Sequence, residues 1–184
     1  MTSLTTNLVL VTVGTDHHPF TRVVEWTNDY VAAQPSESVE FVCQHGTAAP
    51  PSLGRHEPYV GHDALQQLMR KAAAVVCHGG PSTMLESLRL GRMPIVVPRR
   101  QQFGEAVDDH QLEFSRFLCR CEQVVMAETE EQLHAALDRA LADPDAFVAP
   151  PAPASWVSSA TAVQRFSDFA RQLPPRRRGR LLRR

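Results

Sequence analysis

One short stretch of the 184-residue chain holds the side chains whose types and spacing best fit a chemical role. His78, Gly79 and Gly80 form a turn, and Ser82 and Thr83 follow it. Glycines allow an anion to approach the backbone, and a helix that begins there would offer unpaired N–H groups and the positive end of its dipole. The two hydroxyl groups and a histidine ring N–H would add donors. The turn predicts a phosphate site, with a tight turn that binds nothing as the alternative.

Glu86 follows Ser82 and Thr83 about one helical turn later, on the same side of the predicted helix. Its carboxylate would repel a phosphate, but it could accept two hydrogen bonds from a ribose diol. A phosphate site followed by a diol acceptor suits a nucleoside diphosphate better than inorganic phosphate. A solvated helix residue is the alternative for Glu86.

The flanking residues predict the elements that would position this site. Residues 74–77 are an apolar run typical of a buried strand, and Pro81 suits the first position of a helix. Gly91 would end that helix, and residues 94–98 would form the next buried strand. The apolar face of the helix would comprise Met84, Leu85 and Leu88. This unit places the turn at the carboxyl edge of a parallel sheet, where ligands bind in open α/β folds.

Strands and helices alternate along the rest of the chain. We expect strands at 8–13, 39–43 and 122–126, and helices at 20–33, after a cap at Asp63, at 108–118, and from Thr129 to about residue 141. The alternation predicts an α/β fold with a Rossmann-like, doubly wound parallel sheet. Gly14-Thr15 and Gln44-His45-Gly46 follow strands as the central turn does, so the three loops should gather at one edge.

Composition and the end of the chain predict the domain organisation. We expect a sheet domain at 1–148, a proline-rich linker and helix at 149–173, and a basic disordered tail at 174–184. The net charge of −1 disfavours a general nucleic-acid binder, and the four cysteines do not form a secreted disulfide framework. No stretch resembles a membrane span or signal peptide, which predicts a cytoplasmic protein.

Further polar residues follow the strand predicted at 94–98. Arg99 could neutralise a phosphate, and Asp109 and Gln111 could hydrogen-bond sugar hydroxyls. Solvated loop residues and a helix cap are the alternatives. His17-His18 lacks the spacing of a zinc site with His78 or His110, so we expect no metal.

Three motifs resemble a known family. They are VTVGT near the start, HGG-x-ST-x-x-E in the centre, and VPRR followed by GEAVDDHQLE. Across residues 8–141 they resemble the glycosyltransferase family 28 C-terminal domain, and most of all the Alg13-like and PssE-like soluble subunits of two-component enzymes. The resemblance implies the C-terminal half of a GT-B fold, which binds a UDP-sugar and acts without a metal or other cofactor.

The resemblance also implies roles for individual residues. Matching positions comprise the diphosphate loop (His78, Gly79, Gly80, Ser82 and Thr83), the ribose acceptor (Glu86), the donor-sugar segment (Asp109, His110 and Gln111) and the first glycine turn (Gly14 and Thr15). Ala106 stands where the family pattern has a histidine, which leaves the donor sugar open.

The function implied is an inverting transfer of a sugar, with glucuronic acid as one candidate, from a UDP-sugar to a lipid-linked saccharide in exopolysaccharide or glycolipid synthesis. The chain has no room for an acceptor domain, so the resemblance implies a membrane-associated partner subunit similar to Alg14 or PssD. The partner would hold the catalytic base, with His17 as the candidate within this chain. The helix at 155–173 would dock the partner or pack on its own domain, and the basic tail would approach anionic lipid or have no function. A non-catalytic nucleotide-sugar-binding regulatory subunit and a membrane-assembly adaptor are the rival interpretations.

Overall fold

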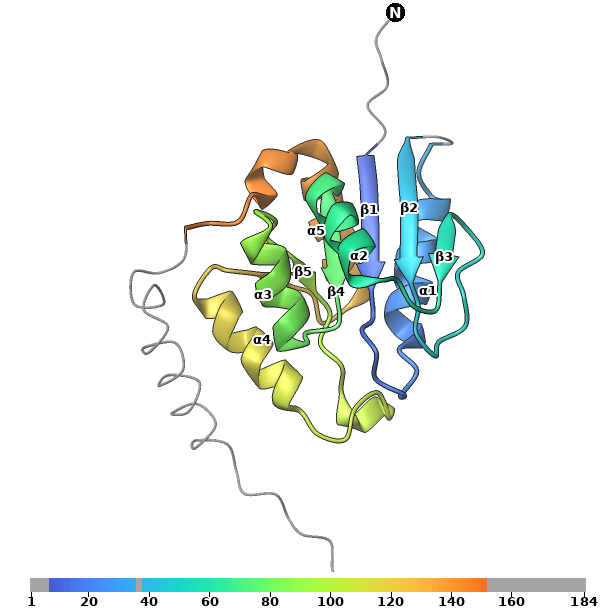
Figure 1. Cartoon of the computed structure of the whole chain (residues 1–184), viewed down its shortest axis with the longest axis vertical. Helices are drawn as coiled ribbons and strands as arrows, with labels where there is room; N and C mark the ends of the chain where they lie inside the picture. Colours follow the sequence, from blue (N-terminus) through green and yellow to red (C-terminus); the bar gives the residue numbers. More distant parts are fainter. Residues whose placement is uncertain (1–6, 36–37, 152–184) are drawn as a thin grey trace, which may run out of the picture. The chain divides into compact units, whose positions relative to one another are not determined.

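The computed structural model describes residues 7–35 and 38–151. Within them, six parallel strands form one sheet in the order β3-β2-β1-β4-β5-β6 (Figure 1). The strands are β1 (Asn7–Thr12), β2 (Val39–Gln44), β3 (Arg55–Glu57), β4 (Ala74–Cys77), β5 (Ile95–Val96) and β6 (Val125–Met126). The helices are α1 (Thr21–Ala32), α2 (His62–Lys71), α3 (Pro81–Arg89), α4 (His110–Arg120) and α5 (Glu130–Ala142), with short 3₁₀ turns η1 (Gln101–Phe103) and η2 (Pro144–Phe147). The predicted Rossmann-like α/β fold is confirmed.

Strand β1 shows how the sheet is covered on both faces. Val9 and Val11 point into a core shared with α1 and α5, whereas Leu8 and Leu10 point into a second core with α2. All four side chains are buried because each face of the strand meets a helix layer. This explains why the strand is a continuous apolar run instead of an alternating one.

Two predictions about the helices are wrong. Leu85 does not belong to the inner face of α3: its side chain is 46% exposed, and Ser87 is buried beside Met84 instead. The Ser87 hydroxyl donates to the carbonyl of Arg92 at 2.9 Å, which satisfies a polar group in that position. Asp63 lies in the first turn of α2, but Gly61 is the N-cap residue and receives no side-chain cap.

The end of the sheet domain also differs in part from the prediction. The strand expected at 122–126 is confined to Val125–Met126, because α4 continues to Arg120 and Glu122 adopts a positive φ of 57°. The Thr129 hydroxyl caps α5 by accepting from the Gln132 N–H, as predicted. The predicted helix at 155–173 and the basic tail lie outside the described residues. None of the helices that the structure describes is both long and apolar enough to cross a membrane.

Candidate functional site

The carboxyl ends of β1, β2 and β4 meet around a cavity of about 260 Å³, so the three predicted loops do gather at one edge of the sheet. The cavity is lined by Thr12, Gly14, Thr15, Gln44, Tyr59, Val60, Leu65, His78, Gly80, Pro81, Ser82 and Thr83. The predicted site residues in this lining are Gly14, Thr15, His78, Gly80, Ser82 and Thr83. The other predicted residues lie elsewhere and are described below.

Helix α3 begins at this cavity. Gly80 is its N-cap residue and Pro81 occupies the first helical position, as the sequence predicts. No side chain of the described residues caps this helix end. The N–H groups of its first turn are therefore open to a ligand from the cavity, and the helix dipole favours an anion there. The hydroxyl groups of Ser82 and Thr83 stand at the same end.

Gln44 joins two of the loops and was not among the predicted site residues. Its Oε1 accepts from Thr12 Oγ1 at 2.7 Å and from the Gly14 N–H at 3.1 Å. Its Nε2 donates to the carbonyls of Gly14 and Pro58, each at 2.8 Å. A polar residue at the end of an apolar strand is the signal in the sequence that could have identified it.

His78 lies between the first and third loops with only 8% of its surface exposed. Burial, followed by the charge of Arg99, lowers the pKa of His78 to about 4, so the ring is neutral at neutral pH. Nδ1 lies 3.4 Å from the carbonyl of Thr12, and a carbonyl can only accept, so Nδ1 carries the ring proton. Nε2 is then an acceptor. The expectation that His78 donates a ring N–H to a phosphate stays a prediction.

Glu86 lies outside the cavity lining, where it contacts Gln66 of α2 and Arg89 of its own helix, α3. Its carboxylate accepts from Gln66 Nε2 and forms an ion pair with Arg89, at 2.7 Å from Nη2. The hydrogen bond from Arg89 holds the pKa of Glu86 below its usual range, so the group stays ionised at neutral pH. Each carboxylate oxygen still has capacity to accept from a hydroxyl.

Arg99 is fully buried and does not face the cavity as a direct phosphate ligand. Its Nη1 donates to the carbonyls of His18 and Glu105, at 2.7 and 2.9 Å, and its Nη2 donates to the carbonyl of Val13 at 2.8 Å. The side chain therefore fastens the loop after β1 to the loop after β5. The sequence predicts an arginine that binds a phosphate or lies in solvent at this position, whereas the structure buries its side chain.

The donor-sugar segment predicted from the family lies at the start of α4, outside the cavity lining. Asp109 accepts from the Gln101 N–H at 3.0 Å, and His110 lies 2.6 Å from the carboxylate of Asp108. The Oε1 of Gln111 is buried without a hydrogen-bond partner among the described residues. Gly79 has a φ of +85°, and a β-carbon there would lie 2.8 Å from Oγ of Ser115 on α4, so this position has no room for a side chain.

His17 points into solvent, with 83% of its side chain exposed, and does not line the cavity. Together with Asp16 and His18 it brings three ligand atoms within 4.8 Å of one another, a spacing that could hold a metal ion. Hydrogen bonds account for part of this closeness, because Asp16 Oδ1 lies 2.6 Å from His18 Nδ1 and accepts the His18 N–H at 2.8 Å.

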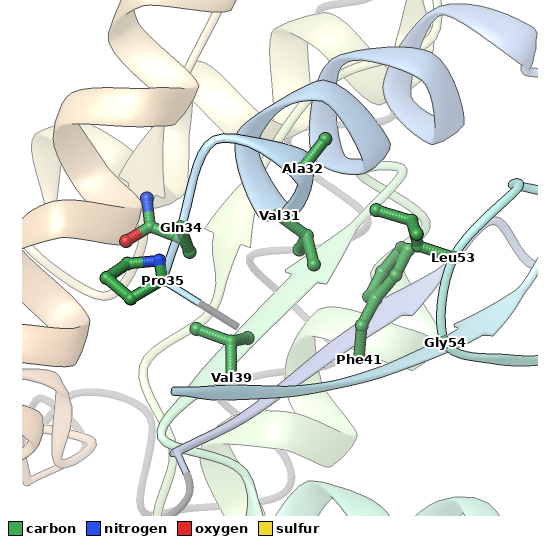
Figure 2. Close-up of a pocket in the computed structure, with 8 residues that line it drawn as sticks. All are labelled: Val31, Ala32, Gln34, Pro35, Val39, Phe41, Leu53 and Gly54. Carbon is green, nitrogen blue, oxygen red and sulfur yellow. The ribbon is translucent and has the colours of Figure 1, made fainter. Parts of the chain in front are cut away.

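A second cavity of about 410 Å³ lies at the opposite edge of the sheet, where α1 ends and β2 begins (Figure 2). It is lined by Val31, Ala32, Gln34, Pro35, Val39, Phe41, Leu53 and Gly54. None of these residues is charged or nucleophilic, so the groove offers no group for catalysis. The cavity at the carboxyl edge is the site with chemical potential.

Comparison with known proteins agrees with this geometry. The model of the family described as glycosyltransferase family 28 C-terminal domain matches residues 8–173. The glycotransferase of kitacinnamycin has the same fold at 20% identity and a TM-score of 0.58, and the match covers 76% of this chain and 36% of that one. MurG of Acinetobacter baumannii matches at 19% identity and a TM-score of 0.55, over 78% of this chain and 43% of that one. VinC in complex with dTDP matches at 20% identity and a TM-score of 0.52, over 90% of this chain and 38% of that one. No curated protein matches.

The chain spans about two fifths of the length of these solved structures, and it corresponds to the C-terminal half of the GT-B fold. At such low identity the structural likeness establishes the fold alone. The family match covers most of the chain and establishes its membership. The chain belongs to the family of glycosyltransferase family 28 C-terminal domains.

Proposed function

We propose that this chain binds the UDP-sugar donor of an inverting glycosyltransferase at the carboxyl-edge cavity. The observation that carries the proposal is the uncapped N-terminus of α3, which opens onto a cavity that Ser82 and Thr83 also line. A diphosphate bound there would accept hydrogen bonds from the first-turn N–H groups and meet the positive end of the helix dipole. Gly80 lets the phosphate approach the backbone.

Another part of the cavity lining suits a nucleobase. Tyr59 is 55% exposed and lines the cavity together with Val60 and Leu65. An exposed aromatic ring next to an anion site offers a stacking surface, and base–aromatic stacking is worth about 1–3 kcal/mol. The lining thus offers polar groups for a diphosphate and apolar side chains for a base.

The remaining parts of the donor would extend from the cavity. Glu86 is ionised and follows the phosphate site along α3, so it would accept hydrogen bonds from the ribose diol. The segment Asp109, His110 and Gln111 would contact the donor sugar, which is the role of the matching family segment. The unpartnered Oε1 of Gln111 is an acceptor available for a sugar hydroxyl.

In the transfer, the acceptor oxygen would form a bond to the anomeric carbon while the bond from that carbon to the UDP oxygen breaks. Charge then develops on the leaving diphosphate, where the helix N-terminus would stabilise it. The acceptor hydroxyl must lose its proton to a base. Tyr59 and His78 are the ionisable residues of the cavity lining, and His78 is a weak base because burial lowers its pKa to about 4.

The missing base supports a second subunit. We propose a membrane-associated, acceptor-binding partner similar to Alg14 or PssD, which supplies the base and a lipid-linked saccharide at the inner face of the membrane. The length of the matched structures, of which this chain spans about two fifths, fits a donor half that works with another half. His17 remains the candidate base within this chain, because its exposed loop follows β1 at the same edge.

The test is calorimetric titration of UDP and UDP-glucuronate into the purified chain and into its Ser82→Ala/Thr83→Ala variant. We expect the double variant to bind UDP about tenfold more weakly, since it loses two donors to the diphosphate. Ser52→Ala is the matched control, because Ser52 is exposed and outside the cavity. Equal affinity of all three proteins would refute the site.

A non-catalytic regulatory subunit would also bind the donor. The fact that favours it is the lack of a placed base in the cavity lining. Product formation from the UDP-sugar separates the two functions: an enzyme subunit yields glycosylated lipid when the partner is added, whereas a regulatory subunit changes only the rate of another transferase.

A further inference from the structure

Arg99 is the largest of the fully buried side chains in the described chain. Its guanidinium donates to three backbone carbonyls and lies 4.8 Å from the ring centroid of Phe20. Its Nε has no hydrogen-bond partner among the described residues. Side chains that are fully removed from water are usually apolar, so a positive charge buried at this position needs a physical explanation.

Arg99 forms no direct ion pair with a carboxylate among the described residues, although the charges of Asp16 and Glu105 act on it from a distance. The carboxylate of Glu105, a residue that is only 5% exposed, pairs instead with Arg22, at 2.8 Å from Nη2. Glu105 accepts a hydrogen bond from Arg99 with its backbone carbonyl and not with its carboxylate. A buried cation without an ion pair is unfavourable by itself, and a nearby anionic ligand would offset that penalty.

Arg99 is also tied to the cavity wall. It holds the carbonyls of Val13 and His18, which stand at the two ends of the loop that carries Gly14 and Thr15. Its own backbone N–H donates to the carbonyl of His78 at 3.3 Å. After burial, the charge of Arg99 is the next cause of the lowered pKa of His78, so its field reaches a residue of the cavity wall.

We infer that Arg99 is a positioning residue for the anion site: it clamps the loop at 14–17 and places a buried positive charge without a direct ion pair behind the cavity, and the diphosphate of the ligand offsets that charge without touching it. The inference rests on the proposed nucleotide site and adds a residue that acts on the ligand without contacting it. It assigns this role to Arg99 and not to Arg22, because Arg22 already forms an ion pair with Glu105.

The experiment compares uridine, which has no phosphate, with UDP. Binding of UDP is measured by calorimetry and binding of uridine by NMR titration, for the wild type and for Arg99→Gln. We expect Arg99→Gln to weaken UDP by about tenfold and uridine by less than about twofold, because only the diphosphate feels the buried charge. Equal weakening of both ligands would overturn the inference and leave Arg99 a structural residue.

Arg99→Lys keeps the test informative if the glutamine variant does not fold. The lysine retains the charge near neutral pH, but a buried ammonium loses its proton more readily than a guanidinium. We expect its preference for UDP over uridine to match the wild type at pH 7 and to fall as the pH rises toward about 9.5, while that of the wild type stays constant over this range. A preference that is independent of pH in Arg99→Lys would contradict the inference.

The matched control is the double variant Arg22→Gln/Glu105→Gln. It removes a buried polar pair next to Arg99 without changing the net charge. We expect its preference for UDP over uridine to stay within about twofold of the wild type, even if the protein is less stable. If the wild type binds neither ligand, the proposed function fails; if the wild type binds UDP and all variants keep the same preference, only the role of Arg99 fails.

Discussion

A β-carbon at Gly14 would lie 2.6 Å from Cε1 of His78, although 64 positions separate the two residues. Gly14 also has a φ of +77°. The imidazole occupies the space that a side chain on the first loop would need, and a β-carbon at Gly80 would meet the same ring. The glycines on either side of His78 therefore allow the buried ring to close the inner wall of the cavity.

Gly14→Ala should destabilise the protein and weaken UDP binding together. The substitution adds a clash with His78 to the penalty of a positive φ, which we expect to lower the free energy of unfolding by about 2–4 kcal/mol. Gly91→Ala is the control, because Gly91 has a φ of +85° with open space around its β-carbon position. Chemical denaturation measures both variants; equal losses would mean that the contact with His78 is unimportant.

His78 should make the protein less stable in acid. Its pKa is lowered from 6.5 to about 4 by burial and then by Arg99, so between these values the unfolded chain binds more protons than the folded one. The free energy of unfolding is therefore highest above pH 6.5 and should fall as the pH drops toward 4, by up to about 3 kcal/mol.

The measurement for His78 is urea denaturation of the wild type and His78→Gln from pH 7.5 to 4. The free energy of unfolding of His78→Gln, relative to that of the wild type, should rise as the pH falls. His56→Gln, at an exposed histidine of β3, serves as the control and should parallel the wild type. A constant difference between wild type and His78→Gln would show that His78 is not the titrating group.

Gln44→Leu should loosen the loops that form the cavity. The variant removes the partner of the Thr12 hydroxyl, of the Gly14 N–H and of the Gly14 carbonyl, whereas the Pro58 carbonyl still accepts from the Gly46 N–H. We expect a loss of about 2–4 kcal/mol in the free energy of unfolding. Gln102→Leu, at an exposed position, should change it by less than about 0.5 kcal/mol. Thermal and urea unfolding would both report the contrast.

Glu86→Gln should remove the preference for a ribose over a deoxyribose. We expect the wild type to bind UDP about tenfold more tightly than 2′-deoxy-UDP, and the variant to bind both alike. Arg89→Gln is the control, because it removes the ion pair of Glu86 but leaves the carboxylate in place. Competition calorimetry gives both affinities. A preference that persists in Glu86→Gln would place the ribose elsewhere.

Chelation should leave donor binding unchanged. The helix N-terminus and hydroxyl groups would neutralise the diphosphate, and the cluster Asp16, His17 and His18 lies outside the cavity lining. UDP titrations with EDTA and with added Mn²⁺ should give the same affinity within about twofold. If EDTA abolishes binding and His17→Ala does the same, the cluster holds a metal that the donor needs.

The sequence by itself determined the local elements and the character of the central turn. Apolar runs marked β1, β2 and β4, and Pro81 after two glycines marked the start of α3. Thr129 marked the cap of α5. These features follow from the backbone preferences of individual residues and from the hydrophobic period within one segment, and both depend only on residues close together in the chain. The alternation of strands and helices then implied a parallel sheet with the loops on one edge.

Tertiary structure decided which side chains meet at that edge. Gln44 reaches Gly14 because β2 lies next to β1 in the sheet. Arg99 reaches Val13 across 86 positions because its long side chain spans from the end of β5 past β4 to the end of β1. Leu85 is exposed for the same kind of reason, since the burial of a helix face depends on what packs against it. A local pattern shows that an arginine follows a strand, but only the packed sheet shows whether water or three carbonyls surround its charge.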